Sequence, residues 1–426
     1  MTETQKLDRK GWGRVLLLGV QHVFAMFGAT VLVPALTGMN TLVALFCAGV
    51  GTLLFHFVTK RKVPVYLGSS FAFIAVIQTV AWHYSGLPGS FDSAQTAAAA
   101  YQAALPYATG GVIVAGAVYL VLALLVKLFG VNRVKSFFPP VVTGPMIIVI
   151  GLTLAPTAIA NIIGDGGAGM GARWIVALAV LLTMIIVSVF CKGFFKLVPI
   201  LFSIIVGYVV ALLFNMVDTT PIREASFLAL PPFFLPKFDG FAILTIAPMA
   251  IVTFMEHMGD ITTNGAVVGK DFMEDPGLHR TLLGDGLATM VAGFLGGPAN
   301  TTYGENTGVL AVTKNYDPRT LRVAAVFAIL MSVFGKLGGF LQSIPAVVMG
   351  GVSMILFGMI ASVGMRTLAE ADLDFAKSRN LIIISLMLVI GLGGAFVNIT
   401  ANVQLSGIAL SALVGIVLNK VLPDNI

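Results

Sequence analysis

The chain has 426 residues, of which 58% are hydrophobic and only 10% are charged, with a formal net charge of +6. A soluble domain carries about 25% charged residues, so this composition excludes a soluble globular protein. The sequence therefore predicts an all-α polytopic membrane protein.

Hydrophobic segments of spanning length recur along the chain, separated by short polar breaks. With the N-terminus placed in the cytoplasm, 21 of the 25 Lys and Arg residues fall inside and 4 outside, as the positive-inside rule requires. The positive charge is therefore a topology signal, and we expect cytoplasmic termini and no nucleic-acid partner. We predict fourteen spans, near 14–37, 40–59, 64–82, 107–130, 137–155, 174–191, 196–216, 240–263, 279–296, 302–313, 320–341, 344–363, 380–397 and 403–422.

The third and tenth spans are irregular, because each opens with a proline and a run of small and polar residues. The runs are Pro64 to Ser70 and Pro298 to Gly304. Proline removes a backbone donor, and glycine and serine favour turns or extended chain. We predict a short extended piece in each span, followed by a half-helix that starts near Phe71 or Glu305. The alternative is a proline-kinked helix that packs closely through its small residues.

The two halves of the chain resemble each other. Gln21-His22 matches Glu256-His257, and Ser69-Ser70 matches Gly304-Glu305, both at an offset of 235. A third match, Pro139-x-Val-Val-x-Gly against Pro345-x-Val-Val-x-Gly, has an offset of 206, because the first half carries a long polar loop at about 83–106. Each match pairs a span with the seventh span after it, so the repeats are inverted, as in many transporters. The alternative is one helical bundle with coincidental matches.

Three carboxylates lie in or beside predicted spans: Glu256, Asp260 and Glu305. Ionisable groups at membrane depth are rare and mark substrate or proton paths. Glu256 and Asp260 are four residues apart and share a helix face. Two like charges so close cannot both ionise easily, which makes the pair a candidate proton carrier. The alternative is a pair exposed at the cytoplasmic end of the helix.

Several neighbouring residues are further candidates. His257 points about 100° away from Glu256 around the helix, so it serves either an interface or the site. Gln21 is equally compatible with a structural role and a ligand contact, and Asp285 lies between two glycines in the ninth span. We find no zinc spacing and no phosphate-binding glycine motif, and we expect no metal and no cofactor.

These residues carry a resemblance to the nucleobase–ascorbate transporter family, and most closely to its bacterial members that carry uracil. The matching runs are Gln21-His22-x-x-Ala25-Met26-Phe27-Gly28-Ala29, Tyr66-Leu67-Gly68-Ser69-Ser70-Phe71-Ala72-Phe73, Glu256-His257-x-Gly259, Asp275-Pro276-Gly277-Leu278-His279-Arg280 and Asn300-Thr301-Thr302-Tyr303-Gly304-Glu305-Asn306.

The resemblance implies fourteen segments in two inverted repeats of seven, with a core domain and a gate domain. The core domain would comprise residues 1–131 and 240–342, and the gate domain residues 132–239 and 343–426. It also implies a homodimer in the bacterial cytoplasmic (inner) membrane. Its activity would be the import of uracil with protons by alternating access, the proton being the only coupling partner.

Carried over by motif, Glu256 and Glu305 would bind the ring N–H groups of the base. The backbone N–H groups of Phe71, next to Ser70, and Gly304 would meet its carbonyl oxygens. Tyr303 would shape the pocket, and Glu256, Asp260 and Glu305 would couple the proton.

Two positions depart from the pattern. The family's uracil permeases can carry His at the position of Asp260, where xanthine and urate transporters carry Asp. The gate-domain tyrosine expected in the family is Phe357 here. A purine base therefore remains an alternative cargo. A channel or anion carrier, or an intramembrane enzyme with paired carboxylates, remains an alternative from another class.

Overall fold

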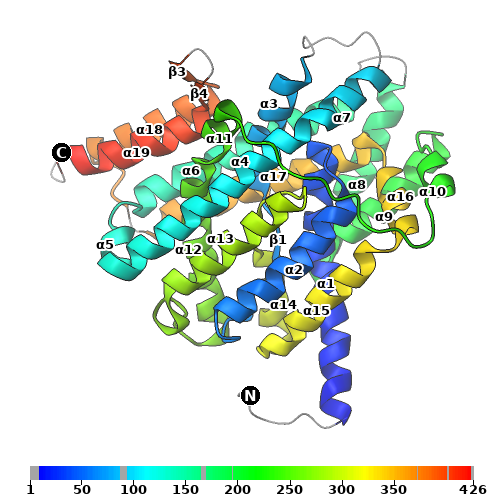
Figure 1. Ribbon diagram of the computed structural model, residues 1–426, viewed down its shortest axis with the longest axis horizontal. Helices are drawn as coiled ribbons and strands as arrows, with labels where there is room; N and C mark the ends of the chain where they lie inside the picture. The colour runs from blue at the N-terminus through cyan, green and yellow to red at the C-terminus, as the bar shows by residue number, and fades with distance from the viewer. Residues whose placement is uncertain are drawn as a thin grey trace.

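The computed structural model describes residues 9–86, 94–164, 169–193, 195–371, 373–400 and 403–423. These residues form a bundle of helices with two pairs of short strands (Figure 1). The helices are α1 Arg9–Thr37, α2 Thr41–Val58, α3 Ile74–Ser85, α4 Ala94–Phe129, α5 Val131–Lys135, α6 Pro140–Thr153, α7 Ala155–Ile163, α8 Met170–Phe190, α9 Pro199–Leu213, α10 Thr220–Glu224, α11 Gly240–Ile246, α12 Met249–Val268, α13 Leu278–Phe294, α14 Gly304–Thr313, α15 Pro318–Ser332, α16 Gly335–Gln342, α17 Ala346–Glu370, α18 Ser378–Leu392 and α19 Gly407–Val421. The strands are β1 Leu67–Ser69, β2 Asn300–Thr302, β3 Val397–Thr400 and β4 Val403–Leu405, and the short irregular helices are η1 Phe71–Phe73, η2 Phe195–Leu197 and η3 Met273–Gly277.

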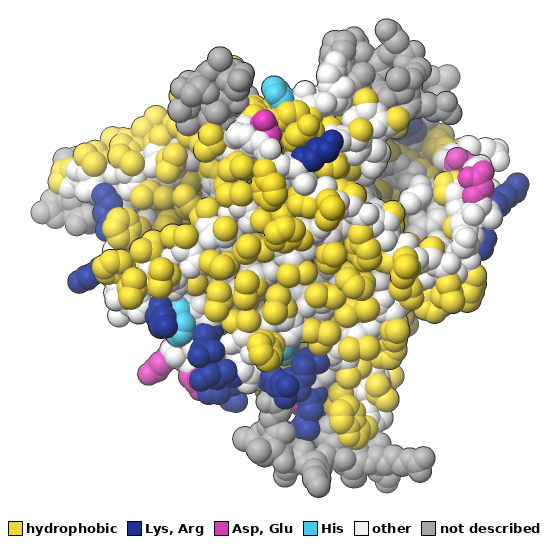
Figure 2. Space-filling model, viewed as in Figure 1, with side chains coloured by type: hydrophobic (Ala, Val, Ile, Leu, Met, Phe, Trp, Pro, Cys, Tyr) yellow, Lys and Arg dark blue, Asp and Glu magenta, His cyan; other side chains and the backbone are white. Residues whose placement is uncertain are grey.

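One face of the bundle is apolar across its middle. Hydrophobic side chains cover the centre of the face shown in Figure 2, and Lys and Arg side chains gather toward its lower edge. On α8, Leu182, Ile186 and Phe190 are all more than half exposed. Large apolar side chains exposed in this number need lipid against them.

Within the described ranges, seven helical stretches are long and apolar enough to cross a membrane: Gly11–Thr37, Thr41–Val58, Ala98–Phe129, Pro140–Ile163, Met170–Phe190, Gly240–Val268 and Ala346–Glu370. Four shorter apolar helices accompany them, at Phe71–Ser85, Pro199–Leu213, Ser378–Leu392 and Gly407–Val421. The fold is therefore helical with several membrane-length helices, and the fourteen-segment count stays a prediction.

The predicted polar loop at about 83–106 is wrong in part. Helix α3 continues to Ser85 and α4 already begins at Ala94, while residues 87–93 lie outside the described residues. The stretch from Ala94 to Ala104 has seven alanines among its eleven residues. Alanine has the highest helix propensity, and here it outweighs the low hydropathy that suggested a loop.

The two predicted helix breaks are confirmed. β1 and β2 are extended, pair antiparallel, and lie at the centre of the bundle, with Leu67 opposite Thr302 and Ser69 opposite Asn300 (Figure 1). Helical chain resumes at Phe71 after β1 and at Gly304 after β2.

The helices pack in two groups. In the first, α4 packs on α13 and α3, while α2 packs on α13 and α15, and α1 packs on α15. In the second, α17 packs on α6, α7 and α8, with α9 against α8 and the α18–α19 pair against α6. Each group therefore draws its helices from both halves of the sequence.

Glycines bring α4 and α13 into close contact. A Cβ on Gly286 would lie 2.9 Å from the carbonyl oxygen of Gly116, and a Cβ on Gly116 would lie 2.8 Å from that of Gly286. Small residues let membrane helices approach in this way.

Replacement of Gly286 by valine tests this packing. We expect Gly286→Val to destabilise the purified protein by about 1–3 kcal/mol, because the added carbons have no space. The measurement is the apparent melting temperature in detergent. Gly171→Val on α8 is the matched control, since a Cβ there meets no atom within 4 Å. Equal melting of both variants would contradict the close approach.

Candidate functional site

The strand crossing fixes the start of α14. The Tyr303 backbone N–H donates to the Tyr66 carbonyl at 2.9 Å. Tyr303 is the N-cap residue of α14, but its side chain forms no hydrogen bond with the first turn, so the helix start has no side-chain cap. The first N–H groups of a helix have no intrahelical partner, so they carry partial positive charge and can donate to a ligand. Gly304 is exposed, which leaves this helix end accessible.

Three carboxylates surround that helix end. Glu256 and Asp260 come from α12 and Glu305 from the first turn of α14. Each of the three side chains is half-buried, and α12 packs against α14. Asp260 Oδ1 lies 3.8 Å from the position that a Cβ of Gly304 would take. The structure therefore brings the three predicted acids together.

Open space lies beside these acids. A Cβ on Gly259 or Gly308 would meet no atom within 4 Å, and both glycines are exposed. The two glycines belong to α12 and α14, the helices that carry the acids. Each helix therefore has one position near its acids that no neighbouring atom covers.

Tyr303 is buried, and its side chain is hydrogen-bonded to β1. Its hydroxyl donates to the Ser69 carbonyl at 2.9 Å and accepts from Thr30 Oγ1 at 3.4 Å. Its ring lies so close to Gly68 that a Cβ there would come within 2.4 Å of it. Tyr303 thus holds the two breaks together at the wall of the site.

The segment after β1 completes the same region. Ser70 is buried, and its backbone N–H donates to the Ala299 carbonyl at 2.9 Å. Phe71 follows at the start of η1, half-buried, where Ser70 gives no side-chain cap. The N-terminal end of this helical segment therefore starts within the same strand crossing as α14.

Phe357 lies in an apolar cluster between the two packing groups. It is buried with Val33 and Ile74 from one group and with Leu154 and Ala158 from the other, and Phe71 packs against this cluster. Phe357, a candidate from the sequence, is therefore linked to the site by Phe71, which packs against the same apolar cluster.

A cavity of about 550 Å³ lies beyond this cluster, lined by Leu36, Gln78 and Asn161 among others. Along α1, Thr30 contacts Tyr303 at the site, Val33 belongs to the cluster and Leu36 lines the cavity. The apolar cluster therefore separates the cavity from the acids.

The His257 side chain is buried, and its contacts are with α13 and β2. Its Nδ1 lies 2.8 Å from Asp285 Oδ2 and its Nε2 lies 2.9 Å from Thr281 Oγ1. Thr302 Oγ1 on β2 donates to the Asp285 carboxylate at 3.4 Å. All four side chains are buried. This network joins α12, α13 and β2 behind the site.

The sequence reasoning named His257 and Asp285 separately and missed their contact. No spacing rule links residues 28 positions apart on different helices. The available signal was that both are ionisable residues inside apolar helices, where such groups usually pair.

Gln21 is half-buried on α1, and its neighbour His22 is buried. Asn306 Nδ2 donates to the His22 carbonyl at 3.1 Å and lies 3.1 Å from His22 Nδ1. The first turn of α14 is thereby attached to α1, so the Gln21-His22 motif supports the site from behind.

Comparison with known proteins assigns this chain to a family. A family model named Xan_ur_permease, described as a permease family, matches residues 13–400. The chain belongs to this permease family. The resemblance to nucleobase transporters is confirmed, and the chain is a multi-pass membrane transporter and not an enzyme.

Curated relatives of the chain are similar over nearly their whole length. The probable uracil permease of Pasteurella multocida is 45% identical over 95% of this chain and 93% of its own. The uracil permease of Bacillus caldolyticus is 45% identical over 98% of this chain and 94% of its own. That of Escherichia coli (strain K12) is 42% identical over 95% and 90%.

Solved structures share the permease fold at low sequence identity. The transmembrane domain of the cyanobacterial bicarbonate transporter BicA has a TM-score of 0.63 and 15% identity, covering 97% of this chain and 98% of that one. The structure of SLC26A9 has a TM-score of 0.68 and 14% identity, covering 95% and 64%.

We expect Asp285→Asn to lower both the melting temperature and uptake. The carboxylate accepts from buried neighbours such as Thr302, whereas asparagine replaces one of its oxygens with an NH2 group. That buried donor would lack an acceptor there, at a cost of about 1–3 kcal/mol. The measurements are thermal unfolding and substrate uptake in vesicles. Glu370→Gln, at an exposed carboxylate on α17, is the control. Wild-type stability in Asp285→Asn would refute the role of the network.

Proposed function

We propose that this protein is a proton-coupled symporter that imports uracil across the bacterial cytoplasmic membrane by alternating access. The observation that carries the proposal is the set of three carboxylates on α12 and in the first turn of α14, near a helix start that has no side-chain cap. The names of the relatives, 42% to 46% identical over nearly the full chain, support uracil as the cargo.

The chemistry of the site suits a flat base with ring N–H donors and carbonyl acceptors. Uracil presents both kinds of group along its edge. Carboxylates accept strongly from N–H groups, and helix-end N–H groups donate to carbonyl oxygens. We assign the ring N–H groups to Glu256 and Glu305 and the carbonyl oxygens to the backbone N–H groups of Phe71 and Gly304, with Tyr303 as the wall.

Proton coupling follows from electrostatics. Three carboxylates that share a space of low dielectric repel one another when all are ionised. One proton on Glu256, Asp260 or Glu305 reduces this repulsion at the moment when a neutral base replaces water. Binding of the proton and of the base therefore favour each other, which is the coupling that a symporter needs.

The strand pairing supports the inverted repeat. At the offset of 235, the repeat equivalent of Leu67 is Thr302, and these two residues face each other in the antiparallel pair. A residue paired with its own equivalent is what a pseudo-two-fold axis through the crossing produces. We propose fourteen segments in two inverted repeats of seven, with both termini in the cytoplasm.

The two packing groups suggest which parts move. We propose that residues 1–131 and 240–342 form a core domain that carries the site, and that residues 132–239 and 343–426 form a gate domain. The apolar cluster around Phe357 would then close the path toward the cavity at Leu36. From the family resemblance, we also propose a homodimer that associates through the gate domains.

A purine base is the second candidate cargo, because Asp260 stands where xanthine and urate transporters carry Asp. Uptake of radiolabelled uracil into vesicles with an imposed inward proton gradient, in competition with unlabelled bases, distinguishes the two. Stronger competition by xanthine or urate than by unlabelled uracil would overturn the uracil assignment.

We expect Glu256→Gln to reduce uracil uptake to background. Glutamine keeps the size of the side chain but loses its charge and one acceptor oxygen, so it holds a ring N–H less well and cannot carry a proton. The measurement is initial uptake by reconstituted protein, with Glu370→Gln as the control. Proton-driven uptake by Glu256→Gln at the wild-type rate would count against this mechanism.

We expect Asp260→Asn to separate binding from coupling. The neutral amide mimics a permanently protonated acid, so uracil exchange across vesicles at equal pH should continue while accumulation driven by a pH gradient falls. Uptake with and without the gradient, in the same vesicles, measures both. Unchanged gradient-driven accumulation would remove Asp260 from the coupling mechanism.

A further inference from the structure

The cavity of about 550 Å³ beside Leu36 lies where the two packing groups of helices meet. Helices α1, α3 and α4 line it from the first group, and α7 and α17 line it from the second. Its volume falls in the range of about 300–1,000 Å³ that small-molecule sites occupy. The apolar cluster around Phe357 separates it from the acids, so it is a second space on the proposed path of the base.

The lining of this cavity is rich in amide side chains. Those that line it are Asn40, Gln78, Gln102, Asn161 and Gln342, and two threonines add hydroxyl groups. An amide offers N–H donors and a carbonyl acceptor side by side without a charge. The lining therefore suits a neutral molecule that carries both donors and acceptors.

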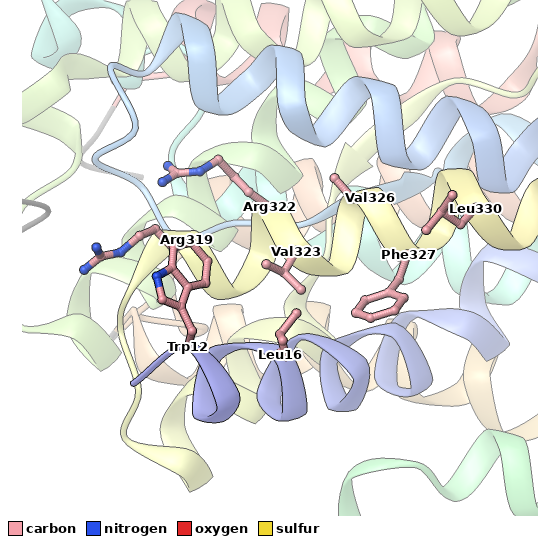
Figure 3. A pocket seen from close by; sticks show the side chains of 8 residues that line it. All are labelled: Trp12, Leu16, Arg319, Arg322, Val323, Val326, Phe327 and Leu330. Atoms are coloured by element: carbon pink, nitrogen blue, oxygen red, sulfur yellow. The ribbon is translucent and has the colours of Figure 1, made fainter. Parts of the chain in front are cut away.

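A groove at the other end of α1 has a different chemistry. Figure 3 shows Trp12 and Leu16 of α1 beside a face of α15 that carries Arg319 and Arg322. By contrast, none of the described residues that line the cavity at Leu36 is Asp, Glu, Lys, Arg or His. An ion that entered this cavity would lose water without gaining an opposite charge, which costs free energy. The cavity therefore disfavours ions.

Two of the amides are held in a defined orientation at the end of α1. Gln78 Nε2 donates to the Leu36 carbonyl at 2.7 Å, and Gln102 Nε2 donates to the Gly38 carbonyl at 2.6 Å. Because both acceptors are carbonyls, each amide must turn its NH2 group toward α1, and its Oε1 remains as an acceptor. A ring N–H group can donate to such an oxygen.

We propose that this cavity is a second, outer binding site for the base, in which amide side chains hold uracil before it reaches the acids. The inference rests on the proposed function, which supplies both the cargo and the direction of α1 from the cytoplasm outward. Ring N–H groups donate to Gln78 or Gln102, and carbonyl oxygens accept from Asn161 or Gln342. Amide side chains pair with base edges through two hydrogen bonds in the same way when they read adenine in DNA.

The test is the protection of a cysteine placed in the cavity. Ala35 lines the cavity and is exposed, so Ala35→Cys gives a thiol there. The full-length protein in detergent is treated with methyl methanethiosulfonate, with and without uracil, and modification is read on the peptide by mass spectrometry. We expect uracil to slow the reaction of this cysteine. Ala376→Cys, at an exposed alanine before α18, is the matched control and should react equally fast with and without uracil. Lack of protection at Ala35→Cys would overturn the proposal.

The same measurement in Glu256→Gln separates the two sites. This substitution removes uptake if the proposed function holds, but it leaves the cavity unchanged, so uracil should still protect Ala35→Cys. Protection that disappears with Glu256→Gln would assign the effect to the acids and refute the second site. Wild-type uptake by Glu256→Gln would contradict the proposed function, whereas the second site is decided by the protection alone.

The role of the amides has its own variants. We expect Gln78→Met and Gln342→Met each to need about 2- to 10-fold more uracil for half protection, because one hydrogen bond to the base is lost. Gln342 is exposed, so its variant serves where Gln78→Met does not fold. Orotate, which is uracil with an added carboxylate, should need at least about 10-fold more than uracil, because the cavity offers it no opposite charge. Unchanged half protection in the folded variants, or equal protection by orotate, would overturn recognition by amides.

Discussion

The fold depends on hydrogen bonds made by extended backbone in the interior of an apolar bundle. Away from water, an unpaired N–H or C=O group costs several kcal/mol, so a break in a membrane helix persists only where every such group finds a partner. β1 and β2 pair with each other. Threonines supply further bonds: Thr52 Oγ1 accepts from the Leu67 N–H at 2.9 Å, and Thr289 Oγ1 donates to the Asn300 carbonyl at 2.9 Å. The breaks are thereby held by α2 and α13 as well as by each other, which fixes where η1 and α14 begin.

The fold places the start of α14, with its partial positive charge, in the interior of the bundle. The side chains around that helix start favour either an anion or a neutral molecule as the cargo. BicA, which shares this fold, is named as a bicarbonate transporter, and SLC26A9 structures are described as those of an anion transporter. An uncapped helix start favours anions by itself. In the site that we propose, Glu256, Asp260 and Glu305 lie near that helix start, and each of them that is ionised repels an anion. The combination disfavours a free anion and favours a neutral ring that offers both N–H donors and carbonyl acceptors, which argues against the anion-carrier alternative.

The sequence predicted those features that follow from local chemistry. Proline next to small polar residues predicted both breaks, and carboxylates in apolar segments led to the residues of the site that we propose. The loop at about 83–106 was misjudged because hydropathy and helix propensity disagree in an alanine-rich stretch. The contact of His257 with Asp285 and the attachment of Asn306 to His22 could not be predicted, because they depend on how separate helices pack. The offset of 235 did anticipate which extended segments are equivalent, although the antiparallel register needed the structure.

Hydrogen bonds around the acids and apolar packing near Phe357 differ in how much movement between helices they permit. Around the acids, α1, α12, α13, β1, β2 and α14 are joined by directional bonds among buried polar side chains such as Thr30, Tyr303 and His257. Any sliding between these elements would leave buried polar groups unpaired, so this part resists deformation. The contact near Phe357 is made by apolar side chains from α1 and α3 on one side and from α7, α17 and Leu154 on the other. Apolar contacts are not directional, and one packing can be exchanged for another at little cost. A rigid polar site beside an exchangeable apolar contact is the division that the proposed alternating access requires. The acids would then keep their geometry while the path to them opened and closed. Phe357 has no hydroxyl that could form a hydrogen bond across this contact, so its apolar packing can be exchanged in the same way.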